Sequence, residues 1–218
     1  DKRDETRARD YAIELAAQQI AQGSANFAAK SLCRLAQRAK LRDMRSLCLN
    51  WTERAVQIAP EDSWARGQLA DAYLYYGRLD EAQSEFDRAY SLDDRYFGLT
   101  GSVRVEMARG AFIEALSKIR KIKFEFAAQQ DGYVSWTLEA EILRQMWLLE
   151  EALAVYDDAV RKFPDQRMVY CGKAAVLTNL GRQREAIAVY SACIDLLGPD
   201  VVSLSGRAQA LLELGQFK

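Results

Sequence analysis

The sequence contains no histidine among its 218 residues. Without an imidazole it lacks serine–histidine and cysteine–histidine pairs, histidine metal ligands and the usual general base near neutral pH. No glycine-rich phosphate loop with its lysine and hydroxyl is present either. Most hydrolase designs are therefore excluded within this segment, and we expect no enzyme, no cofactor and no metal site.

Proline, long apolar runs and paired cysteines are also scarce. Only three prolines occur, with no proline-rich or serine-rich linker, and no apolar run approaches the roughly 20 residues that cross a bilayer. The four cysteines, Cys33, Cys48, Cys171 and Cys193, form no close pairs of the kind that hold zinc. Buried free thiols suit a reducing compartment, so we expect a cytoplasmic protein. A targeting segment removed before Asp1 would not appear in this sequence.

Charge is balanced overall, with 30 basic and 31 acidic residues, but unevenly distributed. Two basic clusters stand out: Arg34, Arg38, Lys40, Arg42 and Arg45, and then Lys118, Arg120, Lys121 and Lys123. Either could contact nucleic acid or an acidic partner, whereas ordinary surface solubility is the commoner role of such runs. Acidic stretches beside them argue against a continuous phosphate track, so we do not expect nucleic-acid binding.

The most informative feature present is a ladder of glycines and alanines. Gly77, Gly110 and Gly181 each follow a helix-like run and precede an alanine by five residues. Between Gly110 and Gly181, Trp147 stands where the pattern would have a glycine, and Ala152 follows it by five residues. Gly215 follows one more helix-like run. The alanine-to-alanine steps of 33, 37 and 34 residues are typical of a two-helix repeat.

Each repeat has a physical cause. Leu69, Ala70 and Tyr73 recur at helical spacing before Gly77, while Ala82 and Phe86 recur at helical spacing after it. Glycine tolerates the left-handed backbone that ends the first helix. The alanines are small because closely crossing helices leave no room for larger side chains.

These residues resemble the tetratricopeptide repeat family, and the match reappears down the chain. The resemblance implies an all-α fold, a right-handed α-solenoid of helix–turn–helix repeats. We place an N-terminal capping helix in 1–28 and repeats at about 29–62, 63–95, 96–132, 133–166, 167–200 and 201–218, the last truncated. Repeat 29–62 is degenerate, with Asp43 at the turn. Because the chain starts without methionine and stops inside a repeat, we expect a longer protein.

The N-terminal segment is predicted to be one more amphipathic helix, over residues 4–22. Its larger apolar residues are Tyr11, Ile13, Leu15 and Ile20, among alanines, and Gly23 with Ser24 ends it. We interpret it as a cap over the first repeat.

In the family, the first helices of the repeats line a concave groove. Mapped onto this sequence, the groove-lining positions are Lys30, Gln37, Lys40, Trp64, Asp71, Tyr75, Phe97, Arg104, Glu141, Arg144, Met168 and Asn179. Packing between repeats is an equal alternative for Trp64 and Phe97. The family's clamp for acidic C-termini is disfavoured, because its matching sites hold Gly67, Asp71, Thr137 and Glu141.

We therefore expect a protein-interaction scaffold that binds a peptide or partner helix in this groove. The alternative is a structural or sensor arm that self-associates or regulates an attached enzyme or signalling ATPase. The sequence names no partner.

A first prediction follows from the alanines. Replacing Ala82, Ala152 or Ala186 with leucine should overpack a close helix contact and lower the free energy of unfolding by about 1–3 kcal/mol. Thermal unfolding of the three variants measures this. Unchanged melting temperatures in all three would show that these alanines are not at helix crossings.

Overall fold

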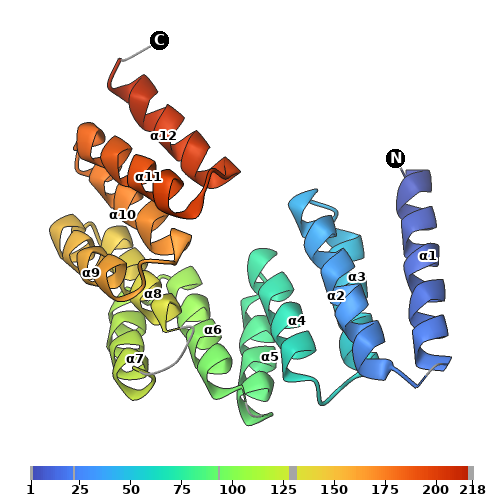
Figure 1. Cartoon of the computed structure of the whole chain (residues 1–218). Helices are drawn as coiled ribbons and strands as arrows, with labels where there is room; N and C mark the ends of the chain where they lie inside the picture. The colour runs from blue at the N-terminus through green and yellow to red at the C-terminus, as the bar shows by residue number, and fades with distance from the viewer. Residues whose placement is uncertain (1, 22, 93, 128–131, 216–218) are drawn as a thin grey trace. The chain divides into compact units, whose positions relative to one another are not determined.

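The chain folds into helices joined by short turns (Figure 1). The computed structural model describes residues 2–21, 23–92, 94–127 and 132–215, which form twelve α-helices and no strand. The helices are α1 (Lys2–Ala21), α2 (Ala25–Leu41), α3 (Arg45–Ile58), α4 (Ser63–Tyr75), α5 (Leu79–Ser91), α6 (Arg95–Ala108), α7 (Phe112–Glu125), α8 (Tyr133–Gln145), α9 (Leu149–Lys162), α10 (Arg167–Asn179), α11 (Gln183–Leu197) and α12 (Val201–Glu213). The predicted all-α solenoid of helical repeats is confirmed.

The helices group into two compact units. Unit 1 contains α1 to α6 and unit 2 contains α7 to α12, with the boundary between Ala111 and Phe112. This boundary lies inside the expected repeat 96–132, between its two helices. No helix in the described ranges is both long and apolar enough to cross a membrane.

The predicted turn residues take the left-handed backbone conformation. Gly77, Gly110 and Gly181 have φ between 73° and 78°, as glycine readily allows. Trp147 adopts φ 60° and Asp43 φ 52° at the equivalent places. The degenerate repeat and the repeat without a turn glycine thus keep the same backbone turn.

Aspartates start three of the helices that follow a repeat boundary. Asp62 accepts a hydrogen bond from the Ala65 amide at 2.9 Å, and Asp94 accepts one from Phe97 at 3.2 Å. Asp200 does the same for Val202 at 2.8 Å. Each side chain satisfies an amide that would otherwise lack a partner in the first turn.

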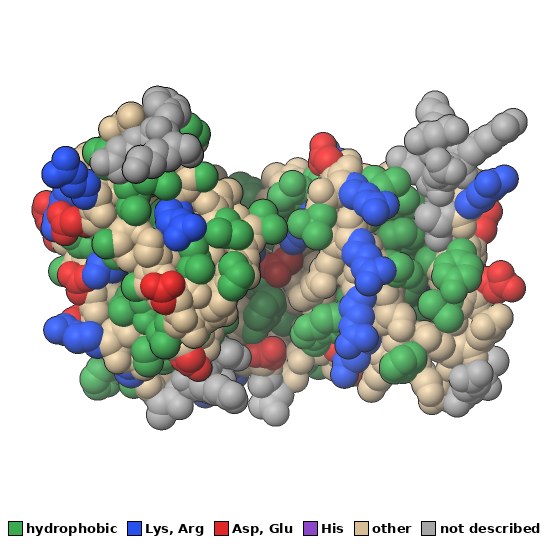
Figure 2. Space-filling model, turned by 45° about the horizontal axis from the view of Figure 1, so that its top comes forward, with side chains coloured by type: hydrophobic (Ala, Val, Ile, Leu, Met, Phe, Trp, Pro, Cys, Tyr) green, Lys and Arg blue, Asp and Glu red, His purple; other side chains and the backbone are tan. Residues whose placement is uncertain are grey.

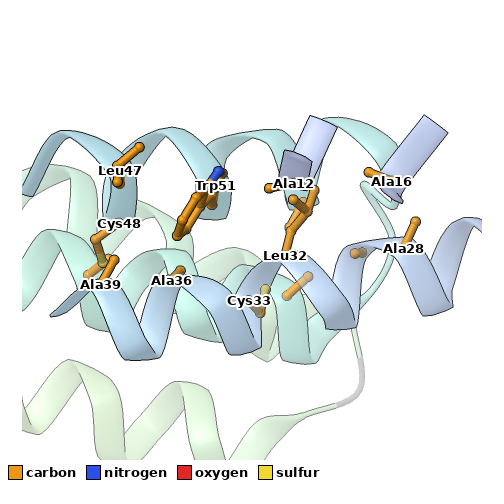
Figure 3. Close-up of a cluster of buried hydrophobic side chains, with 14 of the residues drawn as sticks. Ala12, Ala16, Ala28, Leu32, Cys33, Ala36, Ala39, Leu47, Cys48 and Trp51 are labelled. Carbon is orange, nitrogen blue, oxygen red and sulfur yellow. The ribbon is translucent and has the colours of Figure 1, made fainter. Parts of the chain in front are cut away.

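The N-terminal helix covers the first repeat, but through its alanines. Ala12 and Ala16 are buried in one cluster with residues of α2 and α3, among them Leu32 and Trp51 (Figure 3). The larger apolar residues of α1 are more open to solvent, and Tyr11 is 66% exposed. A helix packed this closely presents its smallest side chains to the contact.

Consecutive repeats interlock through one recurring contact. In both units an aromatic side chain of a second helix packs on a glycine of the following first helix. The aromatic residue comes nine positions after one turn residue, and the glycine comes nine positions before the next turn residue. In unit 1 this pair is Phe86 with Gly101; in unit 2 the pairs are Tyr156 with Gly172 and Tyr190 with Gly206. A Cβ atom built on Gly101 would lie 2.1 Å from Phe86 Cδ1.

The residue at the aromatic position varies together with its partner on the next helix. Where Thr52 replaces the aromatic, the following helix has Gln68, and where Ile119 replaces it, the following helix has Leu138. At this position of the described repeats, glycine is thus present only where a ring packs on it. The pairing sets how closely one repeat can approach the next.

A second prediction tests this interlock. Gly101→Ala should lower the free energy of unfolding by about 1–2 kcal/mol, because overpacking against fully buried Phe86 outweighs the helix propensity that alanine adds. Combining it with Phe86→Leu should recover part of that loss, measured as a double-mutant cycle in urea. If Gly101→Ala instead stabilises by about 0.5–1 kcal/mol, the usual gain in an open helix, the ring contact does not constrain the repeat.

Candidate functional site

Three consecutive first helices of unit 1 are linked by polar contacts along one face. Gln37 Nε2 of α2 donates a hydrogen bond to Gln68 Oε1 of α4 at 2.6 Å, and Lys40 Nζ lies 5.4 Å from the centre of the Tyr75 ring. Arg104 Nη1 of α6 donates to Asp71 Oδ1 of α4 at 2.7 Å. We call the surface formed by these contacts the first-helix face of unit 1. The predicted residues Gln37, Lys40, Asp71, Tyr75 and Arg104 meet there.

An open pocket of about 650 Å³ lies between α2 and the start of α4. It brings together Lys30 and Trp64, two of the residues predicted from the sequence. The other lining residues are Asn26, Arg34, Glu61, Asp62 and Ser63. Trp64 is 36% exposed, so it offers apolar surface beside two cations.

Two aromatic residues of unit 1 differ in how much surface they offer. Tyr75 is 57% exposed at the end of α4. Phe97, in contrast, is half-buried, with its ring against Gly67 and its centre 5.8 Å from that of Phe86. Of the two roles left open for Phe97, packing between repeats is the one its contacts support, whereas Trp64 combines a helix start with exposed surface.

In unit 2, α8 carries a paired cation and carboxylate. Arg144 donates two hydrogen bonds to Glu141, from Nε at 2.8 Å and from Nη2 at 2.7 Å. With its amide oxygen turned toward α8, Asn179 of α10 accepts from Arg144 Nη1 at 3.2 Å. Met168, at the start of α10, is 57% exposed. The part of any of these residues in partner binding remains a prediction.

The Glu141 carboxylate is held in its ionised form. Partial burial favours the protonated acid, but the hydrogen bonds from Arg144 and Gln145 and the charge of Arg144 outweigh it, so the pKa of Glu141 lies below its usual 4.5. This pair therefore presents one fixed negative and one fixed positive charge at neutral pH.

Half of the second basic cluster serves the fold. Arg120 and Lys123 both pair with Glu139, a carboxylate that is 3% exposed, and Lys123 also lies 4.1 Å from the centre of the Trp136 ring. A buried carboxylate needs such partners because desolvation is costly. Sequence reasoning missed Glu139. The sequence feature that could have revealed Glu139 is a carboxylate at a position of α8 that faces the core.

A partly exposed carboxylate of the second helix α9 takes part in a contact between repeats. Asp157 of α9 lies 2.7 Å from the Lys173 ammonium of α10. It therefore links two repeats and is not a neutral control position.

The cysteines are consistent with buried thiols. Burial above all, with smaller effects from Asp62 and Cys48, raises the pKa of Cys33 to about 12. Cys48 and Cys193 are also buried, and Cys171 is partly so. Within the described ranges, no three His, Cys, Asp or Glu side chains are grouped as a metal site would need.

Fold and repeat pattern define a helical-repeat protein. Residues 65–96 and 169–196 match the tetratricopeptide repeat model, and solved tetratricopeptide repeat proteins share the fold over most of the chain. No curated protein is significantly similar in sequence to this chain.

Solved structures with this fold come from several organisms. A thermophilic tetratricopeptide repeat protein of Thermus thermophilus has 19% identity and a TM-score of 0.69, covering 84% of this chain and 99% of its own. A tetratricopeptide repeat protein of Parabacteroides merdae has 13% identity and a TM-score of 0.65, covering 96% and 88%. Yeast Tom70 has 17% identity and a TM-score of 0.68, with 93% of this chain matching 51% of Tom70. At these identities the likeness shows the fold alone.

A third prediction concerns the Glu141–Arg144 pair. Because the folded-state pKa of Glu141 is lowered, its contribution to stability is fully present above the unfolded pKa near 4.5 and is lost as the pH falls through the folded pKa. Glu141→Gln should therefore flatten the fall in melting temperature on acidification from pH 6 toward pH 3 (roughly the window of carboxylate titration). Parallel melting curves of the two proteins across that range would show that the pair does not stabilise the fold.

Proposed function

We propose that this chain is a protein-interaction scaffold and that the first-helix face of unit 1 binds a segment of a partner protein. The fold supports the general role, because repeats of this type stack into extended binding surfaces. The finer assignment is supported by one observation: this face carries Trp64 and Tyr75 as exposed rings beside charged side chains.

Exposed aromatic rings on rigid helices suit recognition for a physical reason. A tyrosine or tryptophan buries a large apolar area with little loss of side-chain entropy, and its polar edge keeps a hydrogen-bond donor available. The polar contacts between α2, α4 and α6 hold the surrounding backbone in place before a partner arrives. Such preorganisation lowers the ordering cost of binding.

In unit 2 the exposed Met168 and the Glu141–Arg144 pair offer a second, smaller set of contact groups. Arg144 is anchored by two hydrogen bonds to Glu141, so it can donate to a further carboxylate without losing its orientation. We propose no catalytic step for either unit.

A fourth prediction tests the partner surface. Once a partner has been captured from the native cell, Tyr75→Ala and Arg144→Ala should each weaken its binding by at least about 1 kcal/mol, roughly fivefold, because central groups dominate such interfaces. Titration calorimetry with the purified partner measures the change, and circular dichroism verifies that each variant is folded.

Glu151→Ala is the matched control, because Glu151 is exposed on the second helix α9 and has no ion pair or hydrogen bond from its side chain to any other described residue. It should bind as the unaltered chain does. If Tyr75→Ala and Arg144→Ala bind normally while Glu151→Ala does not, the second helices carry the function. The structural or sensor arm then becomes the better account.

A further inference from the structure

One line of exposed side chains runs along α2 on the side away from the core. It consists of Phe27, Lys30, Arg34, Arg38 and Leu41, which we call the α2 stripe. At 3.6 residues per turn these positions fall within about 80° of one another around the helix. The buried residues of α2, such as Leu32 and Ala36, lie on the opposite side.

The cations of the α2 stripe lack counter-ions. In the part of the chain that the structure describes, Lys30, Arg34 and Arg38 have no ion-pair partner. Residues 15–42 contain no aspartate or glutamate at all. Figure 2 shows lysine and arginine side chains gathered in a column on the surface of this unit. By contrast, Arg66, Arg104, Arg120 and Arg182 are each paired with a carboxylate.

This arrangement costs the isolated chain stability. Lys30 and Arg34, and again Arg34 and Arg38, are like charges four residues apart, a spacing at which they repel each other and destabilise the helix. An acidic ligand would remove that repulsion. The cations are also already ordered on a helix, so binding would immobilise only their side-chain ends.

The ends of the stripe are apolar. Phe27 is 57% exposed and Leu41 is 86% exposed, and they lie 14 positions apart, so about 21 Å of helix lies between two apolar side chains. The α2 stripe therefore has an exposed apolar side chain at each end and three cations between them.

We propose that the α2 stripe binds an acidic segment of a partner protein in which several carboxylates are flanked by an apolar side chain at each end. The proposal rests on the proposed function in one respect, that the partner is a protein. It adds the partner's charge and the place of its apolar residues. Lys30 and Arg34 also line the pocket beside Trp64, so the stripe adjoins the first-helix face of unit 1.

A peptide fits this surface better than a nucleic acid does. The stripe is one helix long, and Glu61 and Asp62 lie in the same pocket as Lys30 and Arg34. Evenly spaced phosphates would be repelled there, since each neutralised phosphate must find a cation. A peptide can instead place an uncharged residue beside these carboxylates. Its side chains can also cover Phe27 and Leu41, which phosphates cannot.

A fifth prediction uses two synthetic probes. Each is a fluorescein-labelled peptide of about 15 residues with leucine near both ends, and the residues between them are mainly glutamate in one peptide and glutamine in the other. At about 50 mM salt, where screening is weak, fluorescence anisotropy should show the glutamate peptide binding at least about tenfold more tightly. Raising the salt should reduce that difference.

Variants locate the binding. The double variant Arg34→Glu with Arg38→Glu should lose at least about tenfold in affinity for the glutamate peptide. Arg184→Glu, the same charge change at an exposed site of unit 2, should change it by less than about twofold. Leu41→Ser should weaken both peptides without altering the salt dependence. Circular dichroism verifies folding, and a double variant that did not fold would be replaced by Arg34→Gln with Arg38→Gln.

Three results would overturn the inference: equal affinity for the two peptides, an equal loss in Arg184→Glu, or tighter binding of a thymidine oligonucleotide than of the glutamate peptide. Failure here is distinguishable from failure of the proposed function. Suppose that the chain binds both peptides with equal affinity while Tyr75→Ala still weakens binding of a captured partner. The first-helix face of unit 1 then binds protein, and the α2 stripe does not select acidic segments.

Discussion

The structure depends on how closely one helix pair can approach the next. A helix pair of this kind leaves one apolar face open, and only the neighbouring repeat can cover it. In three places a ring from one repeat fills the space over a glycine of the following helix, as Phe86 does over Gly101. The buried alanines, such as Ala82 and Ala152, permit the same closeness within a repeat. Side chains of successive first helices can then reach one another, as Asp71 and Arg104 do.

This packing has a consequence for function. Because the core contacts are local and repeated, the surface of each repeat is free to vary without disturbing the fold. Unit 2 uses much of its charge internally, with Arg120 and Lys123 on the buried Glu139. In unit 1 the described cations Lys30, Arg34 and Arg38 of α2 have no ion-pair partner, and the first two line the pocket beside exposed Trp64. That contrast between paired and unpaired cations is the physical argument for the acidic segment proposed to bind the α2 stripe.

Much of the fold could be read from the sequence because its signals are local. The turn glycines and the alanines five residues later lie where the repeat pattern placed them, and Trp147 takes the left-handed turn conformation in place of glycine. The burial of α1 could not be read in the same way. Helical periodicity favours large apolar residues, whereas close contact with α2 and α3 selected Ala12 and Ala16.

The candidate site was less predictable, since it depends on pairs far apart in the chain. Nothing local distinguishes Arg104, which is paired with Asp71, from Arg34, which has no ion-pair partner among the described residues. Phe97 and Trp64 occupy equivalent helix starts, yet only Phe97 has a neighbouring glycine, Gly67, to pack on. The sequence did contain one signal of the contact between repeats that was missed. The aromatic residue stands nine positions after one turn, and the glycine on which it packs stands nine positions before the next turn.

Hydrogen exchange of the chain, alone and with a partner protein that it retains, tests the central claim most directly. If the first helices of unit 1 form the binding surface, amide exchange in α2 and α4 should slow on binding, while exchange in the second helices α9 and α11 should not change. Protection confined to the second helices, with α2 and α4 unaltered, would contradict the account.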